Sequence, residues 1–247
     1  MAVFRTAYNI FKMKTNLLIV FTAALLLGSC ATGKVTRADY KKDVLLETNY
    51  GNMVLRLSDL TPLHRDNFIK LVKSKYYNGV LFHRVIKNFM IQSGDPDSRH
   101  APGGKPLGEG GPKYTVPAEF NPELFHRKGA LAAAREGDDV NPKQASSGSQ
   151  FYIVQGKVWT NGGLDTLEIK RLKGRKIPAA DRAVYTTVGG TPHLDQHYTV
   201  FGQLIKGNDV LDKIAAVPTS KGADKDRPVY DVRIRKATMI RRADAHR

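Results

Sequence analysis

Apolar and polar positions alternate in the first stretch of the chain that has the pattern of ordered structure. Residues 43–57 hold two runs, DVLLET and MVLRL, with the alternation of half-buried strands. The four residues between them, NYGN at 49–52, include the asparagine and glycine that favour a tight hairpin turn. The body of the chain is therefore predicted to begin as an antiparallel meander.

A helical period follows this hairpin. Leu63, Phe68, Leu71 and Val72 fall on one helix face, and Pro62 suits the first turn of that helix. Strand-like runs then alternate with loops rich in glycine and proline: VLFHRVI, FMIQSG, FYIVQG, YTVFGQLI and VYDVRIRK. Many short strands with few helices predict a mainly β protein, either a barrel or a sandwich.

Two further regions have a helical pattern. Residues 209–216 form a second helix candidate, just before the last strand-like run. The segment 156–193 contains the stretches LDTLEIKRL and PAADRAVYTT, bounded by glycine pairs at 162–163 and 189–190. We expect this segment to be a partly helical insertion between strands.

The N-terminus has the three parts of an export signal. Arg5, Lys12 and Lys14 precede the apolar run LLIVFTAALLL at 17–27, and small residues follow at once, before Cys30. The apolar run is far shorter than the ~20 residues that cross a bilayer as a helix. A cleaved signal is therefore predicted, and a permanent membrane-spanning helix is not.

The motif LGSC, which ends at Cys30, resembles the bacterial lipobox, in which the cysteine becomes lipidated after cleavage. We therefore expect a signal peptide at 1–29, a lipidated tether at 30–42 and a folded domain at 43–242. Acyl chains bind membranes with about 0.8 kcal/mol per buried methylene, so they can anchor a protein without a helix. The expected location is the bacterial cell envelope, facing the periplasm or the exterior. An ordinary secretory signal with a chance cysteine is the alternative.

Charge and residue usage exclude several classes of function. The chain carries a formal charge of +16, which favours acidic partners, but its lysines and arginines are scattered without any nucleic-acid-binding motif. Its only cysteine rules out an intramolecular disulfide and a thiolate metal cluster. No His-Glu-x-x-His motif of a helical zinc site and no Gly-x-Ser-x-Gly elbow is present. We therefore expect no nucleic acid, no metal and no cofactor.

The run FHRVIKNFMIQSGDP at 82–96 resembles the signature of the cyclophilin family of peptidyl-prolyl isomerases. Further blocks that resemble the family follow in its order: GGKPLGEGGPKYTVPAEFN (103–121), HRKGALAAAR (126–135), SSGSQFYIV (146–154) and HLDQHYTVFGQL (193–204). The resemblance extends over about residues 44–240. It implies a closed eight-stranded antiparallel barrel flanked by two α-helices, and an enzyme, expected to be a monomer, that acts on proline-containing polypeptides without a cofactor.

The resemblance also implies the site residues. The family's catalytic arginine falls on Arg84. The substrate-binding positions are a hydrophobic proline pocket, two glutamines that hold the substrate backbone and one backbone contact. The pocket positions are Phe89, Met90, Phe151, Leu194 and Tyr198. The two glutamines are Gln92 and Gln150, and the backbone contact is Ala134.

An arginine suits this chemistry. Rotation about an X-Pro bond meets a barrier of about 18–20 kcal/mol, and no covalent bond is made or broken. The twisted amide loses resonance, so its nitrogen becomes a better hydrogen-bond acceptor. A fixed, permanently charged donor such as Arg84 would stabilise that transition state.

Three features depart from the family's pattern. Arg135 stands where many members have asparagine, His193 stands where some have tryptophan, and the segment 156–193 is longer than usual. A second class of function therefore stays open, a peptide-binding or chaperone lipoprotein without useful turnover.

Overall fold

The computed structural model describes residues 33–245. The predicted signal peptide and Cys30 lie outside these residues. Within the described range, no helix has both the length and the apolar character needed to cross a membrane.

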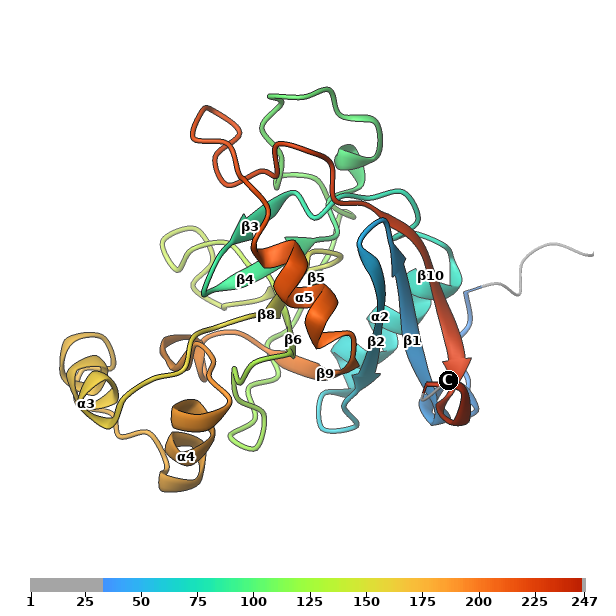
Figure 1. Ribbon diagram of the computed structural model, residues 1–247. Coiled ribbons are helices and arrows are strands. Elements are labelled where there is room, and N and C mark those ends of the chain that lie inside the picture. The colour runs from blue at the N-terminus through green and yellow to red at the C-terminus, as the bar shows by residue number, and fades with distance from the viewer. Residues whose placement is uncertain (1–32, 246–247) are drawn as a thin grey trace, which may run out of the picture. The chain divides into compact units, whose positions relative to one another are not determined.

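An eight-stranded antiparallel sheet is the centre of the fold, and it curls around its own core (Figure 1). Its strand order is β10-β1-β2-β9-β6-β8-β4-β3. The strands are β1 (Lys42–Thr48), β2 (Gly51–Leu57), β3 (Arg84–Ile86), β4 (Met90–Ser93), β6 (Ala130–Ala133), β8 (Phe151–Val154), β9 (Val200–Lys206) and β10 (Ile234–Arg241). A separate two-stranded pair joins β5 (Thr115–Val116) and β7 (Ser146–Ser147). The expected hairpin at 43–57 is confirmed as β1 and β2, which pair directly.

The sheet is not a closed barrel, because its edge strands β3 and β10 do not pair as strands. The segment before β3 is nevertheless linked to the beginning of β10 and to the residues just before it. The backbone N–H of Phe82 donates to the carbonyl of Val232 at 2.8 Å, and that of Ile234 donates to Val80 at 2.9 Å. The mainly β, antiparallel prediction is confirmed, whereas full closure is replaced by a curled sheet with linked edges.

Two helices pack against the sheet, as expected: α2 (Pro62–Lys73) and α5 (Asn208–Ala215). The carboxylate of Glu119 accepts hydrogen bonds from the backbone N–H groups of Leu63 and His64, so it satisfies two unpaired donors at the start of α2. Phe68 is buried as predicted, but Leu63 is half exposed, because it lies on the side of α2 opposite to the buried His64, Phe68 and Val72.

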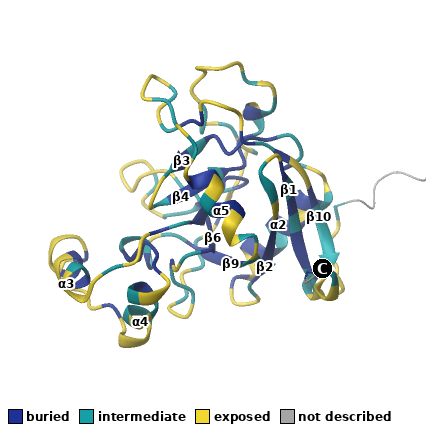
Figure 2. Ribbon diagram, viewed as in Figure 1, coloured by how far each residue is buried: buried dark blue, intermediate teal, exposed yellow. Residues whose placement is uncertain are grey.

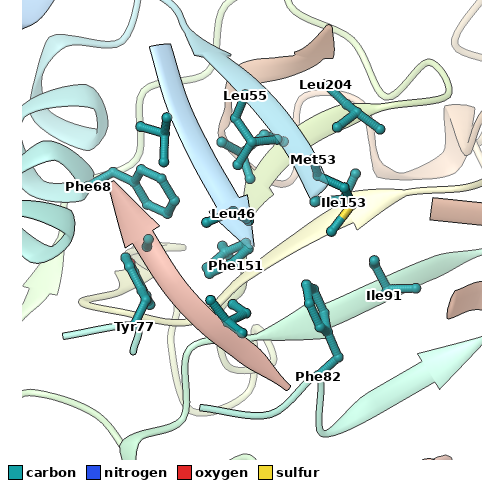
Figure 3. Packing of buried hydrophobic residues seen from close by; sticks show 14 of the residues in the cluster. Leu46, Met53, Leu55, Phe68, Tyr77, Phe82, Ile91, Phe151, Ile153 and Leu204 are labelled. Atoms are coloured by element: carbon teal, nitrogen blue, oxygen red, sulfur yellow. The ribbon is translucent and has the colours of Figure 1, made fainter. Parts of the chain in front are cut away.

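The main core lies inside the curled sheet, where β6 and β8 are buried along their whole length (Figure 2). Phe151 is central to it, with its ring edge-on to Phe68 and Tyr77 at centroid distances of 5.3 and 5.2 Å (Figure 3). Alternate residues of β8 face opposite ways, so Phe151 and Ile153 join this core while Tyr152 and Val154 join a second cluster.

The segment 156–193 contains α3 (Asn161–Lys170) and α4 (Ala179–Thr187). These helices have their own small hydrophobic cluster, formed by Leu164, Leu167, Leu172, Ile177 and Tyr185. We call residues 156–193 the insertion below.

The second cluster, on the outer side of β8, is where the candidate site lies.

Candidate active site

A hollow of about 280 Å³ opens beside the second cluster. It is lined by residues of β3, β4 and β8 and of the segments between strands: His83, Arg84, Phe89, Met90, Gln92, Leu107, Gly108, Glu109, Ala134, Arg135, Tyr152, Leu194 and Tyr198. A larger groove of about 700 Å³ adjoins it and shares Gln92, Gly108, Glu109, Ala134 and Arg135 with it. The two together could receive a side chain in the hollow and an extended peptide along the groove.

Apolar side chains line much of the hollow. Met90 is buried at the start of β4, and Phe89, Leu194 and Tyr198 pack partly buried around the same cluster. Ala134 packs there as well, directly after β6. The structure thus brings together five of the residues that the sequence placed at the substrate site, although they come from distant parts of the chain.

Phe151 does not line the hollow, and its assignment to the pocket is corrected. Its side chain is 1% exposed and points into the main core. Because side chains alternate along β8, its neighbour Tyr152 faces the hollow instead. Both sides of this strand are buried, so the hydropathy of the two residues gave no sign of which one faces the site.

Arg84 begins β3 and lies directly across from Gln92 on β4. Its Nη1 donates to the Gln92 side-chain oxygen at 3.4 Å, and its Nε lies 3.8 Å from the Asp226 carboxylate. The Arg84 side chain is 43% exposed, so its guanidinium stays open to the hollow and to water. The arrangement offers a fixed positive charge beside an apolar wall.

Gln150 supports this arrangement from behind. Its oxygen accepts a hydrogen bond from the Gln92 amide at 3.0 Å. Its own amide nitrogen donates to the carbonyls of Gly108 and Gly110, at 2.6 and 2.9 Å. Gly108 also donates its N–H to the buried carboxylate of Asp95 at 2.6 Å. Gln150 thus fixes both Gln92 and the glycine-rich loop, and its amide group has no donor left for a peptide.

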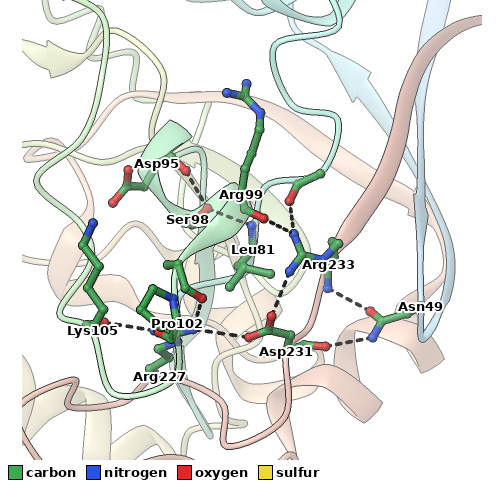
Figure 4. A network of polar contacts seen from close by, with 12 residues as sticks. Asn49, Leu81, Asp95, Ser98, Arg99, Pro102, Lys105, Arg227, Asp231 and Arg233 are labelled. Atoms are coloured by element: carbon green, nitrogen blue, oxygen red, sulfur yellow. Dashed lines mark hydrogen bonds and ion pairs between the residues drawn. The ribbon is translucent and has the colours of Figure 1, made fainter.

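A polar network around Arg227 and Arg233 fastens the neighbouring loops (Figure 4). The buried Arg227 donates to the carbonyls of Pro102 and Lys105, at 2.8 and 3.0 Å, just before the residues that line the hollow. Asp226, the neighbour of Arg227, accepts at its backbone carbonyl from Val85 N–H at 2.8 Å. These contacts keep the Asp226 carboxylate near Arg84. No sequence signal singles out either residue.

Two histidines next to the hollow are held in the neutral form. Burial lowers the pKa of His83 to about 4, against the opposing effect of Asp95. Burial, followed by the nearby charge of Arg171, lowers the pKa of His193 to about 4. The ring of His193 stacks on Phe89 with centroids 5.7 Å apart, so it extends the apolar wall. No group of three metal-ligating side chains occurs among residues 33–245.

Arg135 closes another side of the hollow. Its guanidinium lies 4.5 Å from the ring centre of Tyr198, and its Nε donates to the carbonyl of His197 at 2.7 Å. Asp138 accepts a further hydrogen bond from it. The residue that departs from the family's asparagine is thus a fixed part of the wall.

Comparison with known proteins agrees with this geometry. The family model described as cyclophilin type peptidyl-prolyl cis-trans isomerase/CLD matches residues 43–239. A Staphylococcus saprophyticus protein named as a peptidyl-prolyl cis-trans isomerase is 38% identical over 192 residues, which are 77% of this chain and 88% of the relative. A Staphylococcus epidermidis protein of the same name is 39% identical over 198 residues, which are 78% of this chain and 89% of the relative.

The fold is also similar to solved structures. The crystal structure of a Cryptosporidium parvum cyclophilin type peptidyl-prolyl cis-trans isomerase superimposes with a TM-score of 0.57 at 26% identity, covering 81% of this chain and 97% of that one. A second structure of the C. parvum protein, in the presence of the dipeptide Ala-Pro, gives a TM-score of 0.56 and covers 80% of this chain and 98% of that one.

Proposed function

This chain belongs to the cyclophilin family of peptidyl-prolyl cis-trans isomerases, and we propose that it rotates X-Pro bonds in the hollow beside Arg84. The observation that carries the proposal is the position of the Arg84 guanidinium, which lies open beside an apolar wall and is held by Gln92. The apolar hollow suits the neutral proline ring. The fixed positive donor suits the proline nitrogen, which becomes a better hydrogen-bond acceptor during the reaction.

The role of Arg84 is to donate to the proline nitrogen as the amide twists. A hydrogen bond to a charged group contributes about 1.5–3 kcal/mol, which corresponds to roughly 10- to 200-fold in rate. Asp226 and Gln92 hold the guanidinium on either side, so little reorganisation is needed at the moment of rotation. A guanidinium is a permanently charged donor, so this role needs no protonation step.

The apolar wall binds the proline ring. Phe89, Met90, Tyr152 and Leu194 surround a space in which the ring is removed from water, while the preceding residue is free to turn in the adjoining groove. The C. parvum relative has been crystallised in the presence of Ala-Pro, which makes this dipeptide the natural first ligand.

Two methionines allow a matched test of the pocket. Met90 lines the hollow, whereas Met53 is fully buried in the main core. In a protein with isotope-labelled methionine methyl groups, titration with Ala-Pro should shift the NMR signal of Met90 and leave that of Met53 in place. Saturable shifts elsewhere, with the Met90 signal unmoved, would place the proline pocket at another part of the molecule.

We further propose that the protein is a lipoprotein of the bacterial cell envelope that assists the folding of exported proteins. The support is the sequence alone: a charged segment, a short apolar run and a lipobox-like motif that ends at Cys30. Cys30→Ser should release the folded protein from the membrane fraction of expressing cells. Continued retention of this variant after a high-salt wash would count against lipidation at this residue.

A binding function without turnover remains the second candidate. Arg135 favours it, because this cation stands in the wall next to Tyr198 where many family members have a neutral asparagine. A binding module would give the Met90 shift with Ala-Pro and yet leave the rate of isomerisation at its uncatalysed value. The two candidates are therefore separated by a rate measurement and not by binding.

A further inference from the structure

Four polar side chains form a continuous hydrogen-bonded chain from the insertion to the hollow. The hydroxyl of Tyr185, on α4, donates to Oδ2 of Asp195 at 2.7 Å. The other oxygen of Asp195 lies 2.9 Å from Nδ1 of His126, and Nε2 of His126 lies 2.9 Å from the hydroxyl of Tyr152. All four residues are buried, with at most 6% of their surface exposed.

The chemistry of these groups fixes the direction of the chain. An ionised carboxylate only accepts hydrogen bonds, so Asp195 receives one from Tyr185 and one from the Nδ1–H of His126. The backbone N–H of His126 donates to the same carboxylate at 2.8 Å. Nε2 of His126 is then left to accept from Tyr152. Burial raises the pKa of both tyrosines, so both hydroxyls keep the proton that the chain requires.

The hydrogen-bonded series contacts the site at two places. Tyr152 lines the hollow, and its ring orientation is restrained by the hydrogen bond to His126. Asp195 directly follows Leu194, which lines the hollow from another side. The insertion holds Asp195 twice, because Arg175 donates to its backbone carbonyl at 3.0 Å in addition to the contact from Tyr185.

Hydrogen bonds within the insertion hold its parts together. Glu168, with a side chain only 2% exposed, accepts hydrogen bonds from Lys176, from Arg182 and from the backbone of Ile177, at 2.7, 2.8 and 3.1 Å. These contacts tie α3 to α4 and to the turn between them. The Trp159 indole donates to the carbonyl of Gly190 at 3.0 Å, which joins the beginning of the insertion to its end.

We propose that Tyr185 is a positioning residue for the isomerase site: through Asp195 and His126 it sets Tyr152 and Leu194, two facing parts of the proline pocket. The insertion thereby keeps the pocket residues in place. This inference rests on the proposed function, because it takes the hollow to be where proline binds.

Tyr185→Phe tests the proposal with the loss of one hydroxyl. We expect kcat/KM for an Ala-Pro peptide to fall about fivefold, the size of one lost neutral hydrogen bond. Thr187→Val is the matched control: it removes an exposed hydroxyl from the same helix, one that donates only within that helix, and should leave the rate unchanged. An equal fall in both variants would overturn the proposal.

A double-mutant cycle separates positioning from general damage. If Tyr185 acts in part through Tyr152, then Tyr185→Phe should cause a smaller fall in a Tyr152→Phe background than in the wild type, with only the part that acts through Leu194 left. If the two losses in rate simply multiply, as independent defects do, then Tyr185 does not act on the site through its hydrogen-bonded link to Tyr152.

The ring nitrogens of His126 provide a readout that does not depend on activity. In the wild type, ¹⁵N NMR should show one tautomer with the proton on Nδ1, and Tyr185→Phe should shift the signals of both ring nitrogens, because Asp195 then accepts more strongly from Nδ1–H. An unchanged His126 spectrum in a variant with reduced activity would refute the inference. If the wild-type protein lacked activity, the proposed function would fail, and the His126 spectrum would still decide whether Tyr185 sets this ring.

Discussion

Replacement of Gln150 by leucine tests whether the support behind Arg84 matters for catalysis. Leucine has a similar volume but can neither accept from Gln92 nor donate to the carbonyls of Gly108 and Gly110. Gln92 then loses its hydrogen bond to Gln150 and turns more freely. Arg84, which donates to Gln92 at 3.4 Å, loses one of its two orienting partners.

The size of the effect follows from these contacts. A net hydrogen bond contributes about 0.5–1.5 kcal/mol, and three are lost in Gln150→Leu, so the free energy of unfolding should fall by about 1.5–4.5 kcal/mol. Catalysis should lose the orienting effect on Arg84 alone. One such bond corresponds to a fall in kcat/KM of about three- to tenfold.

The assay pairs peptide isomerisation with urea denaturation. Gln203→Leu is the matched control, because Gln203 bridges the Arg127 side chain and the Lys128 carbonyl and does not line the hollow. Both variants should lose stability, and only Gln150→Leu should lose rate. If the two variants lose rate equally, or if Gln150→Leu keeps its full rate, the supporting role of Gln150 is refuted.

Three other predictions follow from burial and charge. The rate of isomerisation should be nearly flat between about pH 6 and 8, because Arg84 stays charged and both His83 and His193 stay neutral there; a bell-shaped profile would indicate acid–base catalysis instead. The unfolded chain binds a proton on His193 before the folded one does, so stability should fall as the pH drops from 6.5 toward 4. In urea titrations, His193→Phe should lessen this fall by up to about 1.4 kcal/mol per pH unit, and an unchanged slope would contradict the burial of that ring. Phe151→Ala should cost about 3–5 kcal/mol of stability because Phe151 fills the main core, whereas a cost below 1 kcal/mol would mean that its side chain lies elsewhere.

The sequence predicted those features of the fold that depend on local pattern. The hairpin at 43–57, the helix after Pro62 and the helical insertion all follow from spacing and turn residues within a few positions of one another. Closure of the barrel depends instead on how β3 and β10 meet, and these strands are far apart in the chain. Local pattern carries no information about that contact.

The site shows the same limit. The resemblance placed Arg84, Met90 and Leu194 at the hollow, where the structure has them. It assigned Phe151 in place of Tyr152, because two adjacent aromatic residues on a strand buried on both sides look alike in sequence. Supporting contacts were not predictable, since each joins segments distant in the chain: Tyr185 and Tyr152 meet only through the buried side chains of Asp195 and His126.

The rate of cis/trans isomerisation of a short Ala-Pro peptide by residues 31–247, measured beside the Arg84→Ala variant, tests the central claim most directly. The account predicts clear acceleration by the wild-type protein and a fall of at least about tenfold in the variant, which should keep the fold of the wild type because Arg84 is 43% exposed. No acceleration by a demonstrably folded domain, or an Arg84→Ala variant as fast as the wild type, would contradict it.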